Sequence, residues 1–321
     1  MRIFVTGGSG FLGSRMIRTI VNQGHKVFAL ARSTSSAERV RALGATPVTG
    51  DLENSEPLSL PEIEAVVYAA AYFRFAGLRA PYFRANVDGT RALLTAARKA
   101  GAATFIHVSA GGDVMDDRGS PIRDVDESAP TFPNSFSGYV ASKAQGEAAV
   151  LAANKLGFRT IAIRAPAIWG PGDPFSRALP HAIASGKFAF IEHGDYPFAI
   201  CQVDNVIEAV RCALERGTGG HAYFVKDRET TTFRDFIAML ADLQGLSIGG
   251  LKSVSYRLAF IIGHLMEVGA AIRLSKGDPS LSRTLVRMIG REFTVSDAAA
   301  RGDLGYLASV SRAEGIATYR A

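Results

Sequence analysis

The sequence predicts an α/β protein with a doubly wound parallel sheet and a small C-terminal α/β lobe. Short, nearly continuous apolar runs alternate with helical patterns through the first half of the chain, which is typical of parallel strands that are buried on both faces. The first run, residues 1–5, leads directly into glycines at positions 7, 10 and 13 and then into a helical pattern. A chain of 321 residues, 47% of them hydrophobic, is long and apolar enough to bury such a sheet.

The expected elements follow one another in a regular strand–helix rhythm. After the strand at 1–5 and the helix at 12–21, we predict strands at 25–31, 46–48, 65–70, 104–109 and 160–164, and helices at 37–43, 87–100 and about 138–154. A Gly- and Pro-rich segment at 170–174 then breaks the pattern. We therefore expect a nucleotide-binding domain that carries the catalytic helix over 1–174. The mainly substrate-binding lobe should span 175–321, interleaved with late elements of the sheet such as 199–203.

The glycines at 7, 10 and 13 indicate a dinucleotide-binding turn. Glycine allows a tight turn and close approach of the backbone to a pyrophosphate, and the N-terminus of the following helix offers free N–H groups to the anion. At the end of the second strand, where an acidic residue normally holds the ribose of NAD, the chain has Ala31, followed by Arg32 and Ser33. A guanidinium and a hydroxyl suit a 2′-phosphate. We therefore expect NADP(H), with NAD(H) possible and an ordinary surface arginine as the alternative.

Two further features bear on a site. Asp51 and Leu52 follow the third strand and either lie near an adenine ring or form a plain turn. Tyr139 and Lys143 are four residues apart on the helix after the fifth strand, so their side chains share one face. An ammonium beside a phenol favours the phenolate, which makes this pair suited to acid–base chemistry.

Taken in order, these motifs resemble the extended short-chain dehydrogenase/reductase superfamily, the NAD(P)-dependent epimerase/dehydratase family, over almost the whole chain. The matching segments are 6–13 (TGGSGFLG), 51–52 (DL), 69–71 (AAA), 86–90 (NVDGT), 139–143 (YVASK) and Glu147. The resemblance implies a Rossmann domain in which Tyr139 exchanges a proton with the substrate oxygen, while Lys143 holds the nicotinamide ribose and lowers the tyrosine pKa. It also implies that residues 69–71, Asn86 and Pro166 lie along the cofactor. With the residues already considered, the expected cofactor-binding residues are Gly7, Gly10, Phe11, Leu12, Gly13, Arg32, Ser33, Asp51, Leu52, Ala69, Ala70, Ala71, Asn86, Tyr139, Lys143 and Pro166.

One position departs from the family pattern. Members usually carry a serine or threonine just past the fifth strand, where it hydrogen-bonds the substrate carbonyl. A gapless match places Ala110 on this residue, with Ser109 beside it. Either Ser109 takes the role, or the group is lost or supplied elsewhere. His107, inside the apolar strand, is expected to be a core histidine.

The branch of the superfamily is indicated by Phe198. It stands where nucleotide-sugar enzymes of this superfamily have an arginine that clamps the pyrophosphate, and we expect it to leave an apolar wall. The turn at 203–206 and an apolar helix at 258–265, expected to cover a pocket or to lie on a membrane surface, resemble the 3β-hydroxysteroid dehydrogenase and dihydroflavonol reductase branch. We therefore expect an NADP(H)-dependent oxidoreductase that acts on an alcohol or carbonyl group of a mostly apolar small molecule. The alternatives are a nucleotide-sugar epimerase or dehydratase and a non-catalytic NADP(H)-sensing protein.

Composition and charge argue against a nucleic-acid partner, a membrane span and a metal site. The net charge is +6, but the basic residues are scattered, so no nucleic-acid partner is expected. No apolar stretch is long enough to span a bilayer. Cys201 and Cys212 lack metal-type spacing, so we expect free thiols and no metal site. Together with the absence of a signal-peptide pattern, they predict a cytoplasmic protein. The resemblance implies a possible homodimer.

Overall fold

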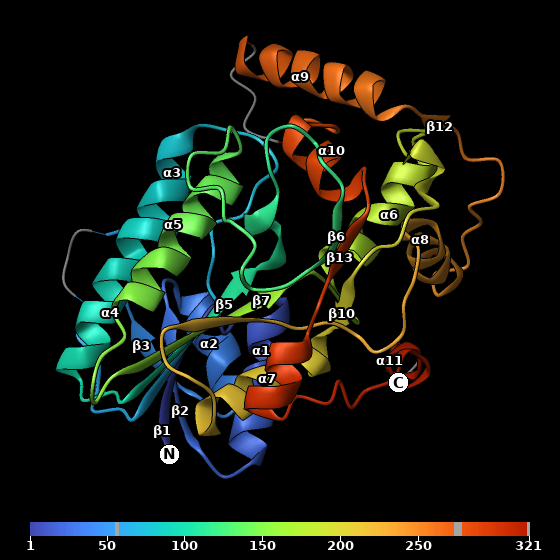
Figure 1. Ribbon diagram of the computed structural model, residues 1–321. Helices are drawn as coiled ribbons and strands as arrows, with labels where there is room; N and C mark the ends of the chain where they lie inside the picture. The colour runs from blue at the N-terminus through green and yellow to red at the C-terminus, as the bar shows by residue number, and fades with distance from the viewer. Residues whose placement is uncertain (55–57, 273–277, 320–321) are drawn as a thin grey trace.

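The computed structural model describes residues 1–54, 58–272 and 278–319. Its centre is a seven-stranded parallel sheet with the order β11-β7-β5-β4-β1-β2-β3 (Figure 1). The strands are β1 (Arg2–Thr6), β2 (Lys26–Ala31), β3 (Thr46–Thr49), β4 (Ala65–Tyr68), β5 (Thr104–Ala110), β7 (Arg159–Ala165) and β11 (His221–Phe224). The predicted fold class is therefore confirmed.

Helices cover both faces of this sheet. One face carries α1 (Phe11–Asn22), α2 (Thr34–Ala42) and α7 (Val203–Glu215), and the other carries α3 (Arg79–Phe83), α4 (Gly89–Lys99) and α5 (Gly138–Ala152) (Figure 1). Side chains alternate between the faces, so Ile106 and Val108 of β5 join the core beneath α1 and α7. Phe105 joins the core beneath α4 and α5. The same alternation directs His107 and Ser109 toward α5.

The element boundaries differ from the sequence expectation at two helices. The helix expected at 37–43 begins at Thr34, because the Ser33 side chain caps it by accepting a hydrogen bond from the Ser36 amide at 3.2 Å. The helix expected at 87–100 is preceded by a π-helical turn, η1 (Arg84–Asp88).

The placement of residues 199–203 in the main sheet was wrong. Their strand, β10 (Ile200–Gln202), pairs with β8 (Ala167–Trp169) in a separate two-stranded sheet. The late strand of the main sheet is β11, which pairs with β7. An apolar run identifies a strand but not its partner, and for this reason the sequence pattern misplaced it.

The C-terminal lobe packs around an aromatic core. It contains α6 (Pro174–Ala184), α8 (Phe233–Asp242), α9 (Tyr256–Ile272), α10 (Arg283–Ile289) and α11 (Arg312–Ala317), with the short strand pairs β6 (Ile122–Val125) and β13 (Phe293–Val295), and β9 (Phe190–Ile191) and β12 (Ser253–Val254). Phe198 is buried there, with its ring centroid 5.1 Å from that of Phe233. Phe198 is thus part of the lobe's core and does not form an open wall.

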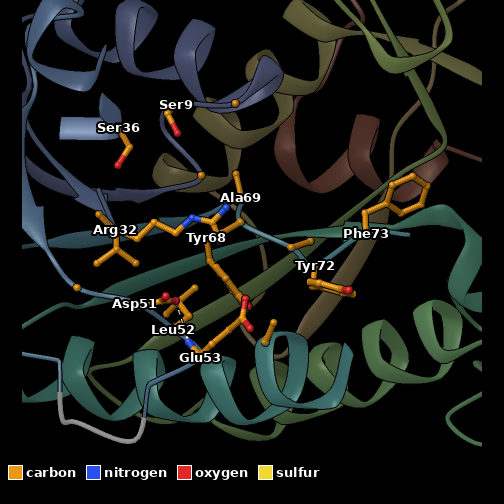
Figure 2. Close-up of a pocket in the computed structure, with 17 residues that line it drawn as sticks. Ser9, Arg32, Ser36, Asp51, Leu52, Glu53, Tyr68, Ala69, Tyr72 and Phe73 are labelled. Atoms are coloured by element: carbon orange, nitrogen blue, oxygen red, sulfur yellow. Dashed lines mark hydrogen bonds between the residues drawn. The ribbon is translucent and has the colours of Figure 1, made fainter. Parts of the chain in front are cut away.

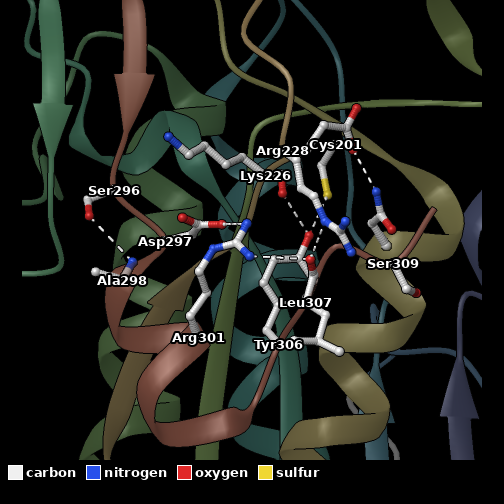
Figure 3. Close-up of polar contacts among 12 residues, drawn as sticks. Cys201, Lys226, Arg228, Ser296, Asp297, Ala298, Arg301, Tyr306, Leu307 and Ser309 are labelled. Atoms are coloured by element: carbon white, nitrogen blue, oxygen red, sulfur yellow. Dashed lines mark hydrogen bonds and ion pairs between the residues drawn. The ribbon is translucent and has the colours of Figure 1, made fainter. Parts of the chain in front are cut away.

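The chain segment after β13 returns to the sheet and fixes the lobe against it (Figure 3). The Tyr306 hydroxyl donates to the Lys226 carbonyl at 2.8 Å, and the Arg228 Nε donates to the Leu307 carbonyl at 2.9 Å. The Leu307 amide donates to the Glu208 carboxylate of α7 at 2.7 Å. These bonds join residues 306–307 to α7, which packs on the main sheet, and to the segment that follows β11.

The predicted apolar helix is α9, which lies over α10 at the edge of the lobe (Figure 1). It packs through Ala259 and Gly263, whereas Leu258, Ile261 and Leu265 are exposed. Among the described residues, no helix combines the length and the apolar character needed to cross a membrane.

Candidate active site

A cavity of about 510 Å³ lies at the carboxyl ends of the sheet strands (Figure 2). Eight of the predicted cofactor-binding residues line it: Gly7, Gly10, Arg32, Asp51, Leu52, Ala69, Ala70 and Ala71. Ser36, Glu53, Tyr72 and Phe73 also line it, and no sequence motif indicated them. In doubly wound sheets, ligands bind at this edge of the strands.

The glycine turn can hold only glycine at two of its positions. Gly7 has a φ of 71°, and a Cβ there would lie 2.9 Å from the Ala70 amide nitrogen. A Cβ on Gly13 would lie 2.1 Å from the Gly7 carbonyl oxygen. The first turn of α1 has neither a side-chain cap nor an acidic residue, so its amides are available to an anion. The turn therefore fits the pyrophosphate of a dinucleotide.

Arg32 extends into the cavity from the region after β2 (Figure 2). It is exposed, and Ser36 lines the same cavity. Ser33 does not line it; its side chain and that of Ser36 form a capping box at the start of α2. Ser36 lies three residues after Ser33, about one helical turn, and this spacing was the signal for Ser36 in the sequence.

The other eight predicted residues lie outside the cavity lining, among them Asn86, Phe11, Leu12 and Pro166. The buried Asn86 side chain accepts a hydrogen bond from the Tyr72 amide at 2.8 Å and donates to the Tyr72 carbonyl at 3.0 Å, so it fixes the segment that lines the cavity. Phe11 and Leu12 are partly buried against the core between α1 and the sheet. Pro166 is buried, and a Cβ on Gly111 would lie 3.3 Å from its Cα.

Tyr139 lies beside the cavity, one turn before Lys143 on α5. Its ring meets the edge of Phe73, a lining residue, with centroids 4.7 Å apart. The buried Lys143 Nζ donates to the Val108 carbonyl at 3.0 Å and lies 3.2 Å from Nε2 of His107. His107 is buried as predicted, and its ring stacks on that of Tyr68 at 4.8 Å.

The electrostatics of this pair differ from the expectation. Burial, together with the charge of Asp113, raises the pKa of the Tyr139 phenol above its ordinary value. Burial lowers the pKa of the Lys143 ammonium, while Asp113 and Glu147 oppose this shift. The phenol pKa is thus raised, opposite to the direction expected from Lys143, and burial is the main cause.

Ser109 forms a hydrogen bond with Asp113, an acidic residue that no sequence motif indicated. The Ser109 hydroxyl donates to Oδ2 of Asp113 at 3.0 Å, and both side chains are buried. Asp113 lies on the short 3-10 helix η2 (Gly111–Val114) that follows β5. Burial raises the pKa of its carboxyl group to about 8, with a further rise from Glu147. An acidic residue four positions after Ser109 was the signal available in the sequence.

A buried ion pair anchors the same helix to the sheet. Glu147 of α5 accepts from Nη2 of Arg164, on β7, at 2.7 Å and from its Nε at 3.1 Å. Both side chains are almost fully excluded from solvent. The pair therefore holds the face of α5 that carries Tyr139 and Lys143 against the strands beneath it.

Comparisons with known proteins agree with this geometry. Residues 4–254 match the model of the 3-beta hydroxysteroid dehydrogenase/isomerase family. The chain is 38% identical to the 4-hydroxy-2-methyl-3-oxo-4-farnesyl-3,4-dihydroquinoline-1-oxide ketoreductase of Stigmatella aurantiaca, over 100% of this chain and 96% of that protein. It is 29% identical to the 2-alkyl-3-oxoalkanoate reductase of Stenotrophomonas maltophilia, over 100% of this chain and 99% of that protein.

A solved structure supports the fold. The UDP-glucuronic acid 4-epimerase of Bacillus cereus, in complex with NAD, superimposes with a TM-score of 0.74 at 19% identity and covers 100% of this chain and 98% of that chain. At this identity the likeness concerns the fold alone. On the family and sequence matches, the chain belongs to the 3-beta hydroxysteroid dehydrogenase/isomerase family and is an NAD(P)-dependent oxidoreductase of the short-chain dehydrogenase/reductase type.

Proposed function

We propose that the protein uses NADP(H) to interconvert a ketone and an alcohol on a mostly apolar small molecule, with Tyr139 as the acid and base. The observation that carries the proposal is the contact between Tyr139 and Phe73. Because Phe73 also lines the glycine-bounded cavity, the phenol lies at the border of the space that fits the dinucleotide.

The residues that line the cavity offer binding groups for the phosphates of NADP(H). The amides after Gly10 would hold the pyrophosphate, and Arg32 with Ser36 would hold a 2′-phosphate. When bound, the nicotinamide supplies or accepts the hydride. The preference for NADP(H) is supported by Arg32 in the lining and by Ala31 where an acidic residue would favour NAD.

Tyr139 would exchange a proton with the substrate oxygen. Its raised pKa keeps the phenol protonated at neutral pH, which is the form that donates to a ketone. Lys143, with its ammonium buried next to β5, would contribute positive charge beneath the reacting oxygen.

Aromatic rings beside Tyr139 support an apolar substrate. Phe73 contacts both Tyr139 and Phe75 edge-on, with ring centroids 4.7 and 4.8 Å apart. Two of the relatives are named for ketones that carry a farnesyl or an alkyl group. A ketone with a long apolar substituent is therefore the substrate class that we propose.

The test is the oxidation of NADPH and NADH by the purified protein, with a panel of alkyl-substituted ketones and one nucleotide sugar. We expect turnover of at least one ketone with NADPH. Tyr139→Phe should abolish it while leaving NADPH binding nearly unchanged, whereas Tyr223→Phe, on the edge strand β11, should retain turnover. Conversion of only the nucleotide sugar, or full activity of Tyr139→Phe, would contradict the proposal.

A further inference from the structure

The environment of Ser109 contains an acidic group that the proposed reaction does not yet use. Asp113 is completely buried, and its Oδ2 accepts the Ser109 hydroxyl at 3.0 Å. Its other oxygen, Oδ1, has no hydrogen-bond partner in the part of the chain that the structure describes. A buried acceptor without a partner destabilises the ionised form of a carboxyl group.

The charged groups around Asp113 come from two elements, α5 and β7. Lys143 and Glu147 face it from α5, Arg164 faces it from β7, and the uncharged Tyr139 phenol lies within its electrostatic reach. Arg164 is bonded to Glu147 and Lys143 is bonded to β5, so both cations are engaged elsewhere. Burial, aided by Glu147, outweighs these cations and raises the pKa of Asp113 to about 8.

The protonation of Asp113 determines what the Ser109 hydroxyl can do. An ionised carboxylate only accepts hydrogen bonds, so it takes the Ser109 hydrogen and leaves the hydroxyl without a donor for a ketone. A protonated carboxyl group can donate to the Ser109 oxygen, which frees the Ser109 hydrogen to bond another acceptor. The heavy-atom positions are the same in both cases, because only the direction of one hydrogen bond reverses.

We propose that Asp113 is a positioning residue whose protonated form turns the Ser109 hydroxyl into a hydrogen-bond donor for the substrate carbonyl oxygen. This inference rests on the proposed ketone reduction. It accounts for Ala110 at the position where the family has its carbonyl-binding residue, because the Ser109–Asp113 pair supplies the donor from one residue earlier. No bond to carbon changes in this step, and the Asp113 proton moves no further than its hydrogen bond to Ser109.

The experiment is the pH dependence of kcat/KM for ketone reduction with saturating NADPH, from about pH 6 to about pH 10. For the natural sequence, kcat/KM should fall about tenfold per pH unit above about pH 8, as Asp113 ionises. Asp113→Asn should retain activity at neutral pH and lose this fall, because an amide donates to the Ser109 oxygen at every pH. Asp126→Asn, a substitution of an exposed aspartate in the same region, should keep the natural profile.

Two results would overturn the inference while leaving the proposed function intact. One is a fall above about pH 8 in Asp113→Asn that matches the natural protein, since Lys143 would then be its source. The other is full activity of Ser109→Ala, for which we expect a loss of about 100-fold. If the natural protein reduces no ketone at any pH, the proposed function fails and this inference fails with it.

A second measurement does not depend on turnover. Infrared difference spectra between the natural protein and Asp113→Asn should show the C=O band of a carboxylic acid at neutral pH. The band should disappear as the pH rises through about 8. Absence of that band at neutral pH would refute the protonated Asp113.

Discussion

Replacing Glu147 by alanine should remove a large part of the stability of this fold. Glu147 and Arg164 are buried and joined by contacts of 2.7 and 3.1 Å, and the variant would leave the guanidinium buried without its partner. Nη1 of Arg164 already has no hydrogen bond among the described residues. Breaking one partner out of a buried pair costs about 3–5 kcal/mol. This is between roughly a fifth and the whole of a typical free energy of unfolding of about 5–15 kcal/mol.

Urea unfolding followed by circular dichroism and by the fluorescence of Trp169 measures this loss. Trp169, the single tryptophan of the chain, is fully buried, so it reports on unfolding of the lobe. The matched control is the double variant Glu147→Leu with Arg164→Met, which replaces both charges by apolar groups of similar volume. It should recover most of the stability, because such replacements of buried pairs are often neutral or stabilising. A loss below about 1 kcal/mol in Glu147→Ala, or a double variant that is less stable than Glu147→Ala, would refute the reasoning.

Two further predictions concern the cofactor. Arg32→Asp should weaken NADPH binding by roughly 10- to 100-fold and NADH binding much less. The reason is that only NADPH loses charge-assisted hydrogen bonds, which are worth about 1.5–3 kcal/mol. Equal losses for the two cofactors in calorimetric titrations would show that Arg32 does not bind the 2′-phosphate. Gly13→Ala should weaken both cofactors by at least about tenfold, because its Cβ would lie 2.1 Å from the Gly7 carbonyl oxygen and would force the turn apart. Gly302→Ala, where a Cβ meets no heavy atom within 4 Å, is the control and should bind both cofactors normally.

Much of the sheet could be predicted from the sequence, because parallel strands buried on both faces leave continuous apolar runs. The strand at 104–109 is an example, since every residue of β5 is buried. The partner of a strand is not encoded locally in this way. Residues 199–203 have the same apolar character, yet their strand pairs with β8 in a separate two-stranded sheet. The separation of two strands along the sequence does not determine whether they pair with each other in the fold.

The candidate site shows the same division between local and distant information. Helical spacing alone places Tyr139, Lys143 and Glu147 on one face, four residues apart, and α5 has that geometry. By contrast, the sequence did not indicate that Ser36, and not Ser33, lines the cavity, although both side chains take part in the capping box of α2. Residue type indicates what a group can bond, whereas the fold decides which bond it makes.

The position of Asp113 could not be inferred from the sequence because its consequences depend on three distant segments. Burial of its carboxyl group requires β7 beside β5 and α5 above both, and only then do Arg164 and Glu147 come near it. Two acids and two bases lie in this buried wall, and its formal charge is zero either when all four are charged or when one acid and one base are uncharged. Because Arg164 is bonded to Glu147 and Lys143 to β5, Asp113 is the member whose charge is least compensated. It should therefore change its protonation near neutral pH, and its charge acts on the pKa of Tyr139, the residue that donates the proton in the proposed reaction.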